Sequence, residues 1–169
     1  MSLKECLKLL DMDKMTKISM DSSRYQFKTR YSLQQRVDML TKKKREMPNH
    51  IPVVVEIEQR TLDTVGQFLR NRSNSVASGS TMAANTIVVW KKYVLQPEAD
   101  VADVLRLARS DLFPEFDLPE HSGYFLYVGV SVGTMANIGE KLKVMFTNHR
   151  DDEDGFLYFR IAIESCFGG

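Results

Sequence analysis

The residue types that most often carry catalysis or bind metals are few in this sequence and lie far apart. Cys6 and Cys166 stand at opposite ends of the 169-residue chain, and the three histidines, His50, His121 and His149, stand in no recognisable relation to them. Nucleophilic catalysis needs a base close to the nucleophile, and a metal site needs ligands at characteristic spacings. Neither pattern is present, so we expect no enzymatic activity, no metal and no cofactor.

A different chemistry is indicated at the end of the sequence, where Phe167-Gly168-Gly169 directly follows a predicted strand. Glycine has no Cβ, so an extended glycine tail can pass through a narrow enzyme cleft. Its carboxylate is also unhindered for adenylation and thioester formation. The tail is therefore a candidate for covalent attachment through a glycine, and the other interpretation is a plain flexible terminus.

The composition fits a single domain in a reducing compartment. The chain has 169 residues with 43% hydrophobic content, enough for one ordinary core. Its two cysteines have no repeated spacing, which argues against a disulfide framework. No apolar run approaches the roughly 20 residues that cross a bilayer, and the first residues mix Lys with Asp, unlike a signal peptide. We expect a soluble cytoplasmic protein.

The near-neutral net charge hides an asymmetry along the chain. Residues 1–50 contain twelve Lys or Arg against six Asp or Glu, whereas residues 97–155 contain five against twelve. Two ordinary solvated faces would explain this pattern. Alternatively, the basic half meets acidic peptides or anionic lipid. We expect no nucleic-acid partner.

The elements that must position the tail begin with a basic helix and a β-branched strand. Ser32 and Gln35 form a capping box, in which the serine oxygen satisfies an unpaired N–H at the helix start. The helix must stop near Met47, because Pro48 disfavours helical geometry in the residue before it. A strand is predicted over residues 51–57, whose β-branched side chains suit a pleated sheet.

The rest of the chain alternates between strands and helices. Residues 59–85 have no sustained pattern and predict a long loop. Residues 101–112 have apolar side chains at helical spacing and predict the main helix. The apolar residues of a shorter second helix are Met135, Ile138, Leu142 and Met145. The further predicted strands are 86–95, 123–129 and 156–163.

This order of elements is typical of a small mixed sheet with its main helix on one face. We predict an α+β fold, a ubiquitin-like β-grasp with a four-stranded mixed sheet and an N-terminal helical extension. The predicted parts are a helical or flexible extension over 1–31, a domain over 32–167 with its long loop at 59–85, and a conjugation tail at 168–169.

Specific runs of residues resemble the autophagy ubiquitin-like modifiers typified by microtubule-associated protein light chain 3 and the GABA-A-receptor-associated protein. Any one of these runs would be weak alone, but together they follow the family order and cover most of residues 32–168. The matching runs are Met47-Pro48-Asn49-His50-Ile51-Pro52-Val53-Val54-Val55-Glu56, Lys91-Lys92-Tyr93-Val94-Leu95, Glu153-Asp154-Gly155-Phe156-Leu157-Tyr158 and Phe167-Gly168.

The resemblance implies conjugation to a lipid. In this family a processing cysteine protease trims the chain after an aromatic-glycine pair, and E1-like and E2-like enzymes pass the exposed glycine to phosphatidylethanolamine. Gly168 matches the conjugated glycine, so cleavage between Gly168 and Gly169 would remove the last residue. Alternatively, Gly169 itself is conjugated. The protein would then be cytoplasmic, and on the autophagosome membrane when lipidated.

Two other functions stay open. One is the related autophagy modifier that is joined to a protein lysine. The other is a ubiquitin-like interaction domain that is not conjugated, for which the tail would be idle.

The resemblance also implies peptide binding. Cargo receptors with short aromatic-x-x-aliphatic motifs would add a strand beside the second strand and insert two side chains into apolar pockets. By motif position, the aromatic pocket is formed by Pro52, Val54, Lys92, Val94 and Phe156. The aliphatic pocket is formed by Tyr93, Leu95, Val104 and Leu107. Lys92 would also meet acidic residues that flank the motif. The alternative for each apolar residue is that it belongs only to the core.

Several residues depart from the family pattern. Met39 and Lys43 stand where the first pocket usually has an acidic and an apolar residue, and His50 replaces a usual Arg. The preferred motif is therefore open. The loop at 59–85 is also longer than usual and enters the strand that would receive the peptide, so it could cover that edge.

Overall fold

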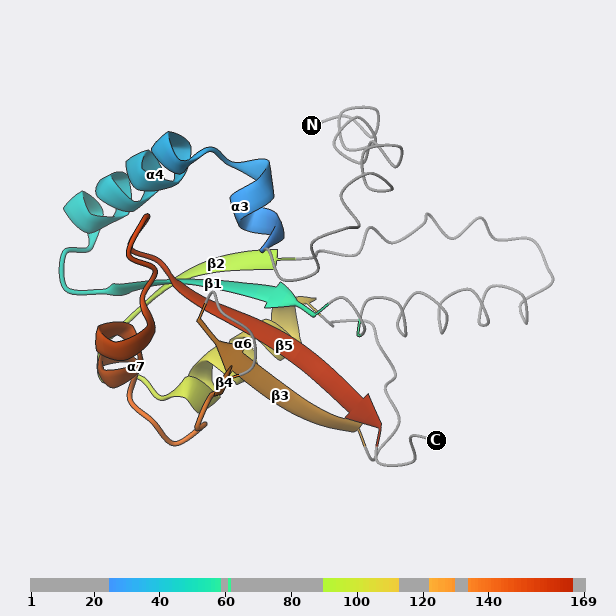
Figure 1. The fold of residues 1–169 in the computed structure, drawn as a ribbon. Helices are drawn as coiled ribbons and strands as arrows, with labels where there is room; N and C mark the ends of the chain where they lie inside the picture. The colour runs from blue at the N-terminus through green and yellow to red at the C-terminus, as the bar shows by residue number, and fades with distance from the viewer. Residues whose placement is uncertain (1–24, 59–60, 62–89, 113–121, 130–133, 166–169) are drawn as a thin grey trace, which may run out of the picture.

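The computed structural model describes five parts of the chain, drawn in colour in Figure 1. These parts are residues 25–58, 61, 90–112, 122–129 and 134–165. Several predicted segments lie largely or wholly outside these parts. They are most of the extension at 1–31, almost all of the loop at 59–85, residues 86–89 of the second predicted strand, and the tail at 168–169.

The described residues form one mixed sheet with the strand order β2-β1-β5-β3-β4. The strands are β1 (Ile51–Ile57), β2 (Trp90–Leu95), β3 (Ser122–Val128), β4 (Thr134–Met135) and β5 (Leu157–Ser165). The central pair, β1 and β5, is parallel, whereas the pairs β1–β2, β3–β5 and β3–β4 are antiparallel. The sequence predicted four of these strands and missed the two-residue β4.

Helices cover both faces of the sheet, as Figure 1 shows. They are α3 (Gln26–Arg30), α4 (Leu33–Glu46), α6 (Val101–Leu112) and α7 (Leu142–His149). Every residue of β1 is buried, because alternate side chains point to opposite faces of a strand and both faces are covered.

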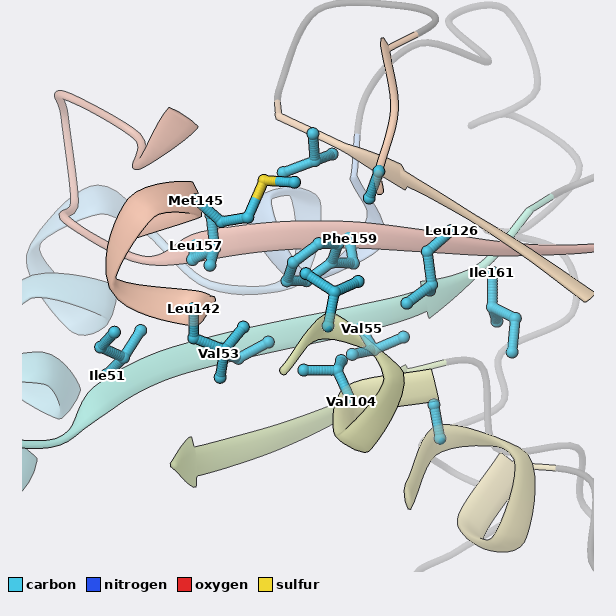
Figure 2. Packing of buried hydrophobic residues seen from close by; sticks show 14 of the residues in the cluster. Ile51, Val53, Val55, Val104, Leu126, Leu142, Met145, Leu157, Phe159 and Ile161 are labelled. Carbon is cyan, nitrogen blue, oxygen red and sulfur yellow. The ribbon is translucent and has the colours of Figure 1, made fainter. Parts of the chain in front are cut away.

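The larger core lies between the sheet and the helices α6 and α7. Figure 2 shows Val104 of α6 and Leu142 of α7 beside Val53 and Val55 of β1, with Phe159 of β5 in the same cluster. All five side chains are fully buried. Burying one such side chain stabilises the fold by about 1.5–3 kcal/mol, so this cluster holds α6 and α7 against the sheet.

A smaller core lies on the opposite face, under α3 and α4. Its buried members are Tyr25, Phe27, Leu40, Val54, Phe156 and Tyr158, with Tyr31, Met39 and Trp90 packed at the margin. Tyr25 and Phe27 fall in the part of the chain that the sequence placed in an N-terminal extension. The structure instead packs residues 25–31 onto the sheet.

The predicted capping box of α4 is confirmed. Ser32 accepts a hydrogen bond on Oγ from the backbone N–H of Gln35 at 3.2 Å, and its own N–H donates to Gln35 Oε1 at 2.8 Å. The helix ends at Glu46, with Met47 as its C-terminal cap, as the following proline predicts.

The prediction of a helix that carries Met135 and Ile138 is wrong. Helix α7 begins only at Leu142. Met135 lies instead in β4, and the side chains of Met135 and Ile138 are 58% and 54% exposed. The physical reason is a contact with α6. The carbonyls of Ile138 and Glu140 accept the N–H groups of Ala102 and Val101 at 2.9 and 3.0 Å. These carbonyls satisfy donors that a helix start leaves unpaired, so they do not continue a helix of their own.

A buried ionic network fastens α3 and α4 to the turn before β5. Arg36 is only 4% exposed, and its Nε donates to Asp154 Oδ2 at 2.7 Å. The same Asp154 oxygen accepts a hydrogen bond from the Tyr158 hydroxyl at 2.7 Å. Lys28 of α3 forms an ion pair with Asp151. The acidic run 151–154 is therefore a structural clamp between the helices and the sheet.

Gly155 allows this clamp to form. Its φ of 78° lies in the left-handed region that favours glycine, and a Cβ there would lie 2.8 Å from Leu40 Cδ2. Any other residue would have to adopt this strained backbone conformation, and its Cβ would displace the end of the Leu40 side chain.

Candidate functional site

Strand β2 lies at one edge of the sheet, next to β1 alone among the described residues. An edge strand has unpaired N–H and C=O groups along its outer side, and an extended peptide can pair with them. The structure thus provides the strand edge that the predicted peptide site requires.

The two predicted pockets fall on opposite faces of this edge. In the register of β1 and β2, Pro52 pairs with Val94 and Val54 pairs with Lys92, so these four residues share the face that α3 and α4 cover. Tyr93 and Leu95 point to the other face, where they pack against the core under α6.

The α4 side of the edge has a shallow depression with a mixed apolar and cationic lining. Its lining residues are Leu40, Lys43, Lys44, Met47, His50, Pro52 and Val94. Pro52 and Val94 are therefore brought together as predicted. Leu40, Lys44 and Met47 were not among the residues that the sequence predicts for the site. Leu40 and Met47 lie seven residues apart, a helical spacing that could have suggested a shared face.

Two predicted members of the aromatic pocket lie deeper than the depression. Val54 and Phe156 are buried in the smaller core, and the Phe27 ring stands edge-on to Phe156 with 5.6 Å between the centroids. A ligand cannot reach either side chain while Phe27 covers them. These two residues are core in this structure, not an exposed pocket wall.

Lys92 projects from β2 toward Met39 of α4 and Phe27 of α3. Its Nζ lies 3.5 Å from Met39 Sδ, 5.9 Å from the centre of the Phe27 ring and 6.0 Å from that of Trp90. Burial lowers the pKa of Lys92, and the charge of Lys43 lowers it further. The positive charges of Lys92 and Lys43 repel each other beside an apolar depression, so an anionic group would be attracted there.

The α6 side of the edge is apolar with one polar link. Tyr93, Leu95 and Leu107 are each half-buried, whereas Val104 is fully buried and belongs to the core. The Tyr93 hydroxyl donates to Asp111 Oδ2 at 2.8 Å. Burial, together with Asp111, raises the pKa of Tyr93, so the hydroxyl keeps its proton and anchors the ring to α6.

The conjugation and cleavage residues, Gly168 and Gly169, lie outside the described residues. In the part of the chain that the structure describes, no three His, Cys, Asp or Glu side chains are arranged to hold a metal ion. Within the same ranges, no helix has both the length and the apolar character to cross a bilayer.

The strand order, with α6 packed across one face, defines an α+β protein with the ubiquitin-like β-grasp fold, so the predicted fold class is confirmed. Among the solved structures that match is the crystal structure of Trypanosoma brucei ATG8, with a TM-score of 0.56 and 16% sequence identity. The match covers 85% of this chain and 98% of that one. At this identity the likeness establishes the fold alone. No protein-family model and no curated protein matches the chain.

Proposed function

We propose that this chain is an autophagy ubiquitin-like modifier that acts by attachment and peptide binding and catalyses no reaction. After a processing cysteine protease removes Gly169, E1-like and E2-like enzymes pass Gly168 to phosphatidylethanolamine; without trimming, Gly169 takes this role. The protein is cytoplasmic before conjugation and on the autophagosome membrane after it. The fold shared with Trypanosoma brucei ATG8 and the sequence resemblance support this proposal.

The observation that carries the proposal is the pair of surfaces on opposite faces of edge strand β2. In an extended peptide, residues three apart point to opposite faces, because side chains alternate with a period of two. An aromatic-x-x-aliphatic peptide that pairs with β2 therefore presents its aromatic side chain toward the α4 face, beside Val94. Its aliphatic side chain meets Tyr93 and Leu95 on the α6 face.

The charges at the α4 face define what flanks the motif. The lysines Lys43 and Lys44 line the depression, and Lys92 stands beside it. The only acidic side chain paired with them in the described residues is Glu46, at 2.8 Å from Lys43. The preferred cargo receptors therefore have acidic residues next to the aromatic position.

The motif spacing provides the test of this proposal. Two fluorescent peptides of equal composition and acidic flank are compared, one Phe-x-x-Leu and one Phe-x-Leu. The shorter spacing puts both side chains on one face, so one anchor is lost and binding is expected to weaken at least about tenfold, since an apolar anchor contributes about 1–3 kcal/mol. Equal dissociation constants by anisotropy would show that the two faces of β2 do not select the motif.

A further inference from the structure

Lys92 is a cation that no carboxylate pairs with in the part of the chain that the structure describes. Its Nζ lies 3.5 Å from Met39 Sδ on α4, and 5.9 and 6.0 Å from the centres of the Phe27 and Trp90 rings. All three of these neighbours are uncharged. A lysine held among neutral groups keeps a charge that an anionic ligand can pair with.

Two carboxylates of the same region are engaged with other groups. Glu46 of α4 forms its ion pair with Lys43 at 2.8 Å. Glu56 of β1 shares the face of the sheet on which Lys92 lies, but its two oxygens accept backbone N–H groups of α3 at 2.9 and 2.8 Å. Burial and the charge of Lys43 both lower the pKa of Lys92, as expected for a cation without a counter-ion.

We propose that Met39 determines which peptides the α4 face of β2 selects. Its neutral thioether contacts Lys92 at a place where a carboxylate would neutralise the charge, so Lys92 is left to pair with an acidic residue of the peptide. This inference rests on the proposed function. It narrows the peptide class to motifs with an aspartate or glutamate two residues before the aromatic one.

The lengths of the side chains explain why a thioether at position 39 matters. The sulfur of methionine and the carboxyl carbon of glutamate are both the third atom beyond Cα. A glutamate at position 39 in the same rotamer therefore puts its carboxyl group where the sulfur lies, within ion-pair reach of Lys92 Nζ. Methionine, glutamate and glutamine all favour helices, so the exchange leaves α4 intact.

The register of β2 decides which peptide residue faces Lys92. Lys92 and Val94 lie on one face of the strand, about 7 Å apart along it. The peptide's aliphatic residue follows its aromatic one and meets Leu95, which follows Val94, so the peptide runs in the direction of β2. The peptide residue beside Lys92 is therefore the one two positions before the aromatic residue.

Fluorescence anisotropy with two matched peptides tests the inference. The peptides Asp-x-Phe-x-x-Leu and Asn-x-Phe-x-x-Leu differ only in charge, and about 0.15 M salt screens distant charges. We expect the wild type to bind the Asp peptide at least about threefold more tightly, as for a partly exposed ion pair. Met39→Glu should abolish this preference, and the neutral isostere Met39→Gln should keep it.

Thr41→Glu is the control for added charge. It puts the same negative charge on α4 but roughly 200° around the helix from position 39, so the preference for the Asp peptide should remain. Loss of the preference in Thr41→Glu would show that the overall charge of α4 makes the selection, and would overturn the role of Met39.

NMR of the lysine side chain provides a measurement without peptide. The pKa of Lys92 should rise in Met39→Glu, because a new carboxylate favours the ammonium form, and should stay at its wild-type value in Met39→Gln. An unchanged pKa of Lys92 in Met39→Glu would contradict the proposed contact.

The outcomes separate this inference from the proposed function. Equal binding of the two peptides by the wild type, or a preference kept in Met39→Glu, would overturn the inference alone. If the wild type binds neither peptide, the proposed function falls as well. Should a thermal melt show that Met39→Glu is unfolded, Lys92→Met replaces it, and a preference for the Asp peptide in that variant would overturn the inference.

Discussion

Replacing Tyr93 and Leu95 together by alanine is expected to weaken the binding of a Phe-x-x-Leu peptide by well over tenfold. Both side chains are half-buried on the α6 face of β2, where they would hold the aliphatic residue of the motif. Each lost apolar contact costs about 1–3 kcal/mol of binding free energy, and the strand pairing alone cannot replace them. Fluorescence anisotropy titration gives the change in dissociation constant.

The matched control for this variant is Met135→Ala. Met135 is an exposed apolar side chain on β4, at the opposite edge of the same sheet, so its loss should leave peptide affinity unchanged. Because Tyr93 and Leu95 also pack against the core, a thermal melt must first show that the double variant is folded. Unchanged affinity in a folded double variant would place the peptide elsewhere on the molecule.

Replacing Arg36 by methionine is expected to lower the free energy of unfolding by about 3–5 kcal/mol, because breaking a buried ion pair leaves an uncompensated charge inside the protein. Arg36 is the ion-pair partner of Asp154, whose carboxylate is buried between α4 and β5. Arg36 also donates from Nη1 to the carbonyls of Lys28 and Tyr31 at 3.2 and 2.7 Å. Urea denaturation measures the change.

Two further variants isolate the ion pair. Arg106→Met breaks an exposed pair with Asp103 and should leave the stability nearly unchanged. Adding Asp154→Asn to Arg36→Met removes the orphaned charge and should recover part of the loss, since the asparagine can still accept the hydrogen bond from Tyr158. A loss below about 1 kcal/mol for Arg36→Met would contradict the clamp.

Local rules predicted the elements whose boundaries depend on nearby residues. The capping box at Ser32, the helix end at Met47 and the strand over residues 51–57 all appear in the structure. The misassigned Ile138 shows the limit of such rules. Its spacing fits a helix, but its carbonyl caps α6 through a contact between residues far apart in the chain. One-dimensional periodicity contains no information about that contact.

The candidate site was also predictable only where it depends on local rules. The alternation of Tyr93 and Val94 on opposite faces of β2 follows from the period of a strand, so the two groups of pocket residues could be separated from the sequence. The covering of Val54 and Phe156 by Phe27 could not, because it depends on where α3 packs. The burial of Glu56 on β1, where its carboxylate accepts the backbone N–H groups of Gln26 and Phe27, could not be predicted either, because it also depends on the packing of α3.

The most direct test of the account is the mass of the product formed on phosphatidylethanolamine vesicles. The purified chain is incubated with ATP, the processing protease and the E1-like and E2-like enzymes of its source. We expect a product that has lost Gly169 and gained one phosphatidylethanolamine through an amide bond at Gly168, and Gly168→Ala should give none. A chain that stays unmodified while a known modifier reacts in the same mixture would contradict the account.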